Sequence, residues 1–200
     1  ILGQWAQAEG RVYDFFEPEM VKKAPEGMYQ KWYVSCDYGT VNPTSMGLWG
    51  RSRGIWYRVK EFYFNSRAAM RQMTDEEYAA ALEKLAGGRK LTAVIVDPSA
   101  ASFIEVLRRR GHPVRKADND VLSGIRLTSD ALKTGRIVIC EGCNDCIREM
   151  DEYVWDLSGG AKDRVKKEHD HAMDDMRYFV STVLGRQETR FAACAVERRK

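Results

Sequence analysis

The stretch Lys31-Trp-Tyr-Val-Ser-Cys-Asp37 decides the fold. Its aromatic and β-branched residues predict a strand that ends in an acid, and Thr40-Val-Asn-Pro43 is typical of a turn. The chain is apolar again from Ser45 to Trp49, makes a tight connection at residues 51–54, and continues as an alternating strand over residues 55–64. Three successive strands joined by short loops predict an antiparallel meander.

Beyond the meander, predicted strands and helices alternate. Residues 91–96 form a continuous apolar run, which predicts a buried strand, and this strand also ends in an acid, Asp97. A short strand is predicted to start at 113–114 and another to span 136–140, and the predicted helices are 75–86, 102–110, 121–134, 145–157 and 170–184. A meander followed by this alternation predicts one α/β domain, with a mixed central sheet flanked by helices.

The size and charge of the chain exclude some classes of protein. Its 200 residues, 44% of them hydrophobic, are enough for one large globular domain. We find neither a signal peptide nor an apolar run of the roughly 20 residues that a membrane helix needs. The net charge of +3 neither establishes nor excludes a nucleic-acid partner. The chain contains no phosphate-binding P-loop and begins without Met, so we expect a piece of a longer protein in which any ATPase lies elsewhere.

Five cysteines, an odd number, argue against a fully paired secreted framework and favour a reducing compartment. Three of them, Cys140, Cys143 and Cys146, have the spacing of an iron–sulfur or zinc site. Neither a nearby Cys-Pro nor a His pair follows to supply a fourth ligand. The sequence therefore favours buried, uncoordinated thiols over a metal site.

Carboxylates mark the expected site. Asp37 and Asp97 stand at the carboxyl ends of predicted strands, which is where sites lie in open α/β sheets. On the last predicted helix, Asp170, His171 and Asp174 fall within one arc, although acids at a helix N-terminus can also simply stabilise its dipole. Carboxylate oxygens suit Mg²⁺ or Mn²⁺, and two such ions about 4 Å apart can clamp both the attacking and the leaving oxygen of a phosphodiester.

At these residues the sequence resembles a known family. The motifs W-Y-V-S-C-D-Y-G-T-V-N-P-T (32–44), V-I-V-D-P-S-A (94–100) and D-H-A-M-D-D-M-R-Y (170–178) resemble, in order, the nuclease domain of large terminase subunits of tailed double-stranded DNA phages. The resemblance covers roughly residues 2–185. It implies an RNase H-like fold and a metal-dependent endonuclease that cuts concatemeric viral DNA during genome packaging, with little sequence specificity.

The resemblance also implies roles for the site residues. Asp37 would bridge two Mg²⁺ or Mn²⁺ ions, Asp97 would bind one of them and Asp174 the other. His171 would be a metal ligand or a proton carrier, and Asp170 a helix cap, a group just outside the ligands or a further possible ligand.

Three neighbours of Asp174 are less defined. Asp175 departs from the family, which usually has a small residue there, so it is a further candidate ligand or a solvated acid. Arg177 and Tyr178 match the family, and for both we favour packing and ion pairing within the fold.

The same resemblance suggests a domain plan and partners. Residues 1–30 would connect to a missing ATPase domain, 31–185 would form the nuclease, and 186–200 a C-terminal tail. The expected partners are double-stranded DNA, a portal protein and a small terminase subunit, with no membrane. The expected location is the host bacterial cytoplasm, at the procapsid portal.

Two basic groups could contact DNA. Lys162, Arg164, Lys166 and Lys167 lead directly into the predicted site and would border it, whereas the group at residues 108–116 is a weaker candidate. Phosphate contacts in either group would be independent of sequence and sensitive to salt.

Two other functions compete with a nuclease. Asp37-Tyr-Gly-Thr40 resembles the phosphate loop of actin-like ATPases and sugar kinases, but those proteins need two lobes and the chain is too short for both. A non-catalytic DNA-binding or docking module with the same fold would be expected to lack one of the three acids, and all three are present.

Overall fold

The computed structural model describes residues 10–156 and 164–185. Within them lie six strands in the order β5-β4-β1-β2-β3-β6. The strands are β1 (Lys31–Asp37), β2 (Thr44–Ser52), β3 (Ile55–Phe64), β4 (Ala93–Val96), β5 (Val114–Lys116) and β6 (Ile137–Ile139). The helices are α1 (Asp75–Ala86), α2 (Ala101–Arg109), α3 (Val121–Lys133), α4 (Asn144–Glu152) and α5 (His171–Val180), with a 3-10 turn at Pro18–Met20 and a π-helical turn at Ser181–Gly185.

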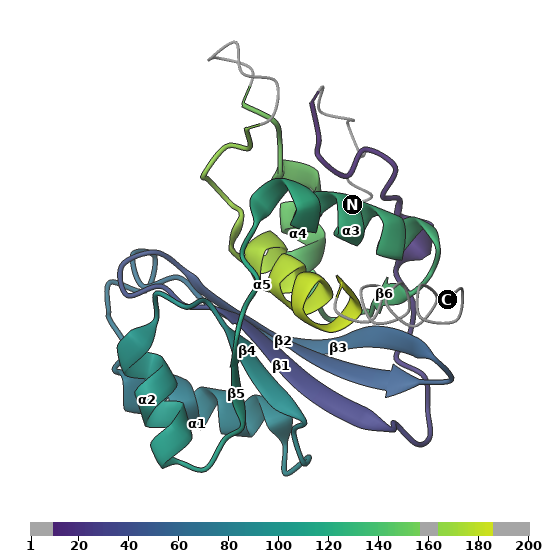
Figure 1. Ribbon diagram of the computed structural model, residues 1–200. Coiled ribbons are helices and arrows are strands. Elements are labelled where there is room, and N and C mark those ends of the chain that lie inside the picture. Colours follow the sequence, from purple (N-terminus) through teal and green to yellow (C-terminus); the bar gives the residue numbers. More distant parts are fainter. Residues whose placement is uncertain (1–9, 157–163, 186–200) are drawn as a thin grey trace, which may run out of the picture.

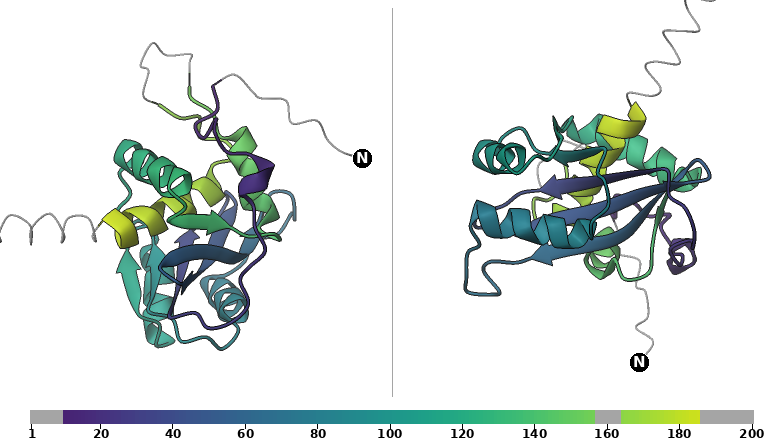
Figure 2. Two further views of the ribbon diagram at one scale, coloured as in Figure 1. Left: turned by 90° about the vertical axis from the view of Figure 1, so that its right-hand side faces the viewer. Right: turned by 90° about the horizontal axis from the view of Figure 1, so that it is seen from below.

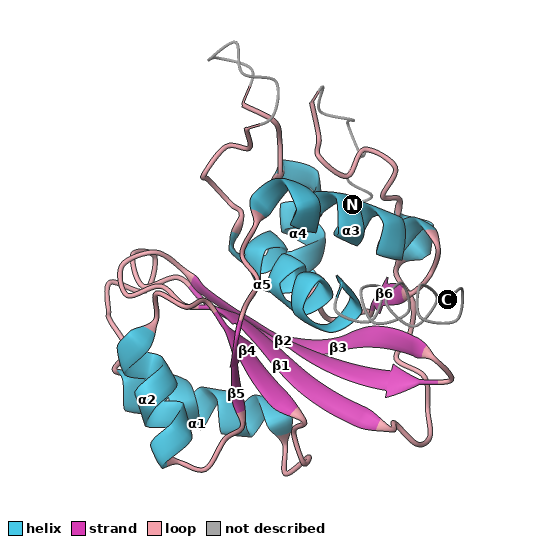
Figure 3. Ribbon diagram, viewed as in Figure 1, coloured by secondary structure: helices cyan, strands magenta, loops and turns pink. Residues whose placement is uncertain are grey.

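The sheet is mixed, as the sequence predicts. Strands β1, β2 and β3 pair antiparallel as a meander, while β4 pairs parallel with β1, β5 with β4, and β6 with β3. Helices cover both faces: α1 and α2 lie on one side of the sheet, and α3, α4 and α5 on the other (Figure 1, Figure 3). The two views of Figure 2 show the same layers from other sides.

Strand alternation divides the core in two. Successive side chains of a strand point to opposite faces. In β1, Val34 and Cys36 belong to the apolar cluster with α1 and α2, whereas Tyr33 belongs to the cluster with α3, α4 and α5. In β4, Val94 and Val96 join the first cluster and Ile95 the second. Odd-numbered positions in both central strands therefore face α5.

Local sequence sets most element boundaries. Helix α1 begins with a capping box between Thr74 and Glu77, and it ends at Gly87, whose φ of 57° is left-handed. Helix α4 ends at Glu152, five residues before the predicted end at Leu157, which lies outside the described residues. The prediction was wrong here because residues 154 and 155 form β-bridges with residues 11 and 165.

The described part of the predicted connecting segment packs on the domain. Tyr13 and Phe16 are fully buried in the core on the α5 side of the sheet. Lys22 forms a parallel bridge with Cys140. The chain from residue 10 onward thus contributes to the core. Residues 1–9 and the predicted tail at 186–200 lie outside the described residues, and the proposed domain boundaries stay predictions. In the residues that the structure describes, no helix is long and apolar enough to span a membrane.

Candidate active site

Two carboxylates meet at one edge of the sheet. The register pairs Cys36 of β1 with Val96 of β4, so Asp37 and Asp97 follow at neighbouring positions on adjacent parallel strands. By the alternation described above, both acids stand at positions that face α5. The sequence prediction that these strand ends lie together is therefore supported by the register.

Helix α5 brings a histidine to Asp37. His171, the first residue of α5, lies with Nδ1 2.8 Å from Oδ2 of Asp37. Burial raises the pKa of Asp37 to about 6; the His171 hydrogen bond opposes this rise, and the nearby Asp174 carboxylate adds to it. Burial lowers the pKa of His171, but the bond to Asp37 outweighs this and leaves it raised. The hydrogen bond thus favours a protonated imidazole beside an ionised carboxylate, against the effect of burial on both groups.

Asp174 lies one turn further along α5, between two cations. Its Oδ1 accepts a hydrogen bond of 2.9 Å from Arg177, and Nζ of Lys167 lies 3.4 Å from its Oδ2. Arg177 also donates to the carbonyl oxygens of Asn119 and Asp120, at 2.9 and 3.2 Å. The ion pairing expected for Arg177 is therefore present, and it fixes one oxygen of Asp174.

Asp97 is held by neutral donors. Burial raises its pKa, but hydrogen bonds from Ser99, Tyr178 and Asn119 outweigh this and leave the pKa lowered. Tyr178 is itself buried, and burial together with the carboxylates of Asp37, Asp174 and Asp97 raises its pKa. The carboxylates of all three predicted ligands therefore contribute to the raised pKa of one phenol on α5.

Asp175 does not share this environment. Its carboxylate is fully buried against the sheet, where Oδ2 accepts from Nη2 of Arg58 at 3.0 Å, and Oδ1 from Nη1 of Arg58 and from Ser35 at 2.8 Å. Ser45 also donates to Oδ2. Since both oxygens are taken by these donors, Asp175 belongs to a buried ion pair, and neither a ligand role nor the solvated alternative fits it.

A buried glutamate caps the helix that carries His171 and Asp174. Oε2 of Glu149 in α4 accepts from the backbone N–H of Ala172 at 2.6 Å, and its Oε1 accepts from the hydroxyl of Tyr63 at 2.6 Å. Asp170 stands at the N-cap position of α5, but its side chain makes no capping hydrogen bond and lies 3.5 Å from Lys167. Burial and the neighbouring Asp174 raise the pKa of Asp170. The capping role considered for Asp170 is thus performed by Glu149.

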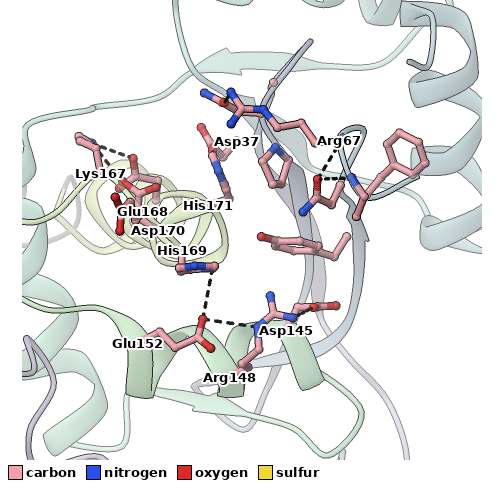
Figure 4. Close-up of a pocket in the computed structure, with 18 of the residues that line it drawn as sticks. Asp37, Arg67, Asp145, Arg148, Glu152, Lys167, Glu168, His169, Asp170 and His171 are labelled. Atoms are coloured by element: carbon pink, nitrogen blue, oxygen red, sulfur yellow. Dashed lines mark hydrogen bonds and ion pairs between the residues drawn. The ribbon is translucent and has the colours of Figure 1, made fainter. Parts of the chain in front are cut away.

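A pocket of about 950 Å³ opens at these residues (Figure 4). Asp37, Asp170, His171 and Asp174 line it, whereas Asp97 does not. Carboxylate oxygens are the donors that Mg²⁺ and Mn²⁺ prefer, so the chemistry of the set fits such ions. In this conformation, however, no group of three or more His, Cys, Asp or Glu side chains in the described residues is arranged to hold a metal ion. In this conformation the carboxylate of Asp174 is instead in contact with Arg177 and Lys167.

The remaining predictions fall elsewhere. Cys140, Cys143 and Cys146 are buried, as the sequence predicts, and burial raises the pKa values of their thiols. In the 108–116 group, Arg109 and Arg110 pair with glutamates of α1. Of the second basic group, Lys167 lines the pocket, while Lys162 lies outside the described residues and Arg164 and Lys166 do not line it.

Three residues of this region have roles that the sequence did not reveal. Arg58 had a detectable signal, because an arginine at an inward-facing position of an apolar strand needs a buried acid. For Tyr178 we predict packing; its hydroxyl is also among the groups that lower the pKa of Asp97. Glu149 had no signal, since a glutamate within a helix is ordinarily exposed.

Comparison with known proteins identifies the family. The family model described as the terminase RNaseH-like domain matches residues 57–182. The large terminase subunit of Escherichia phage T5 is 23% identical over 190 residues, which are 88% of this chain and 42% of that protein. The large terminase of a thermophilic bacteriophage, solved in complex with ADP, is 46% identical, with a TM-score of 0.84 over 92% of this chain and 47% of that one.

Two more distant structures support the fold alone. The P22 large terminase nuclease domain is 19% identical with a TM-score of 0.68, over 87% of this chain and 92% of that one. The large terminase nuclease of thermophilic phage G20c, solved with bound magnesium, is 13% identical with a TM-score of 0.63, over 87% and 98%. This chain spans less than half of the T5 protein and of the terminase solved with ADP. With its mixed sheet and flanking helices, the chain belongs to the terminase RNase H-like domain family.

Proposed function

We propose that this chain is a metal-dependent endonuclease that hydrolyses double-stranded DNA with two Mg²⁺ or Mn²⁺ ions. The observation that carries the proposal is the arrangement of Asp37 and Asp97 on adjacent strand ends, facing the helix that carries His171 and Asp174. The related G20c nuclease was solved with bound magnesium, which supports a divalent ion.

Each residue of the site has a proposed task. Asp37 would bind both ions, Asp97 one and Asp174 the other, and bound ions would activate water and stabilise the leaving oxygen. His171 holds Oδ2 of Asp37 and can carry a proton at Nδ1. Arg177 holds Oδ1 of Asp174, while the Lys167 ammonium supplies positive charge beside Oδ2 in the metal-free chain.

The wider setting follows from the family and is likewise proposed. The chain would be the nuclease of a large terminase, joined through its first 30 residues to an ATPase domain. It would cut concatemeric viral DNA at the procapsid portal in the host bacterial cytoplasm. A portal protein and a small terminase subunit would be its partners. Contacts to phosphates rather than bases would give little sequence preference.

Plasmid cleavage in Mn²⁺ tests the proposal. The Asp37→Asn variant should lose cleavage while its melting temperature in the absence of metal stays close to that of the parent chain. Glu168→Gln is the matched control, because Glu168 lines the same pocket but is exposed and has no proposed ligand role. A chain that binds DNA but never cuts it would instead support the non-catalytic module.

A further inference from the structure

Three Arg or Lys side chains from separate segments of the chain line the pocket, and they differ in how they are paired. Lys167 lies within 3.5 Å of two carboxylates, and Arg148 lies 2.8 Å from Asp145 and close to two glutamates of α4. Arg67, in the turn after β3, donates at 3.1 Å to the neutral side-chain oxygen of Asn42. Among the described residues it has no acidic partner. Arg67 is therefore the pocket cation whose charge is not already neutralised.

The turn that carries Arg67 is fixed to the rim of the pocket. The Oδ1 atom of Asn65 accepts from the backbone N–H groups of Arg67 and Ala68, both at 3.1 Å. The Ser66 hydroxyl donates at 2.7 Å to the carbonyl oxygen of Val41, in the loop that follows Asp37. Figure 4 shows Arg67 at the upper edge of the drawn pocket and Arg148 at its lower edge. The backbone of the turn that carries the guanidinium is thus ordered beside the proposed cleavage site.

The net negative charge of the pocket means that DNA binding there needs a cation that no acid neutralises. Six acids and three cations line it, so in the absence of metal it repels a phosphodiester backbone. Two bound divalent ions would make the pocket positive only close to the carboxylates that coordinate them. A guanidinium further along the wall can bind a phosphate oxygen pair by two parallel hydrogen bonds.

We propose that Arg67 binds a backbone phosphate of double-stranded DNA at the edge of this pocket. The proposal rests on the proposed function, since it assigns a contact for that substrate. The contact positions the strand without reading its sequence.

Binding of a fluorescently labelled DNA duplex, followed by anisotropy across a salt series, tests this contact. The chain is measured in Ca²⁺, with a gel to verify that the duplex stays intact. Arg67→Ala should weaken binding roughly fivefold to tenfold at low salt, and it should reduce the slope of log K against log salt by about 0.9, the value for one phosphate. Arg67→Lys should keep the slope.

Arg71→Ala is the matched control. Arg71 lies in the same turn and is exposed, but it pairs with Glu77 and does not line the pocket. Its loss should leave the slope unchanged. An Arg67→Ala slope equal to that of the parent chain, or an equal drop with Arg71→Ala, would overturn the assignment. If the parent chain cuts plasmid in Mn²⁺ and Arg67→Ala binds DNA as tightly as the parent chain, the proposed Arg67 contact is refuted and the proposed function is not. A parent chain that neither binds nor cuts DNA refutes the proposed function as well.

Discussion

Asp174 and Asp175 are adjacent acids with opposite expected roles, so the same substitution at each should give opposite results. Asp175 and Arg58 both have side chains with 0% exposure. In Asp175→Asn, the guanidinium would keep only Glu61, 3.4 Å away, as an acidic partner. Leaving one charge of a buried pair uncompensated costs about 3–5 kcal/mol of the free energy of unfolding, and Asn keeps the shape, so we expect about 3 kcal/mol.

Asp174→Asn should cost less, about 1–2 kcal/mol, because Asn keeps an Oδ1 that can accept the two hydrogen bonds from Arg177, and only the charge and the contact with Lys167 are lost. Arg177 would keep its two carbonyl acceptors, and the change would relieve repulsion from Asp37 and Asp170. Urea unfolding of the metal-free chain at pH 7 measures both. For a chain of this size, the 3 kcal/mol loss corresponds to a drop in melting temperature of about 6–12 °C.

Nuclease assays at a temperature where both variants are folded complete the comparison. Asp174→Asn should lose cleavage and Asp175→Asn should keep it. A double variant, Arg58→Met with Asp175→Leu, should regain much of the lost stability, because apolar residues can replace a buried pair at little cost. An Asp175→Asn variant as stable as Asp174→Asn would refute the reasoning, and so would a double variant no more stable than the single one.

Three further predictions address the helix cap, the pH dependence and the packing of the sheet. Glu149→Ala should lose about 1.5–3 kcal/mol in urea unfolding, because the N–H of Ala172 loses its charged acceptor, and Glu149→Gln should recover most of it; equal losses would contradict the cap. Because the pKa of Asp37 is raised, its carboxyl binds a proton more tightly in the metal-free fold than in the unfolded chain. Lowering the pH therefore stabilises the metal-free fold through this group. It also weakens metal binding, because a metal ligand must be deprotonated. The rise in melting temperature caused by Mn²⁺ should therefore shrink as the pH falls from 7 to 5, and an unchanged rise would argue against Asp37 as a ligand. Gly47→Ala should destabilise the chain by about 1–3 kcal/mol, because the added Cβ would lie 2.2 Å from Nη1 of Arg58; a variant as stable as the parent would show that the guanidinium can move.

Strand pattern and alternation were enough to predict where Asp37 and Asp97 meet. Side chains along a strand alternate between the two faces of the sheet, so one known buried position decides which face every other residue of that strand occupies. The three strands of the meander were also predicted within a few residues of their observed bounds.

The helical acids were harder to assign from sequence. A period near 3.6 residues separates Asp174 from Asp175 by about 100°, but it does not say which face meets the sheet. That choice depends on Arg58, which lies 117 residues away along the chain. Likewise, α4 ends early because of bridges to residues 11 and 165, which no local pattern contains. Contacts of this range are set by tertiary packing.

The proposed two-metal site is tested most directly by a crystal of this chain soaked in Mn²⁺. Anomalous difference density should show two peaks, one coordinated by Asp37 and Asp97 and the other by Asp37 and Asp174. Lys167 should have moved away from Asp174 in the same crystal, since an ion replaces its charge. Peaks that lie away from these three carboxylates, or no bound ion at Mn²⁺ concentrations that support cleavage, would contradict the two-metal site.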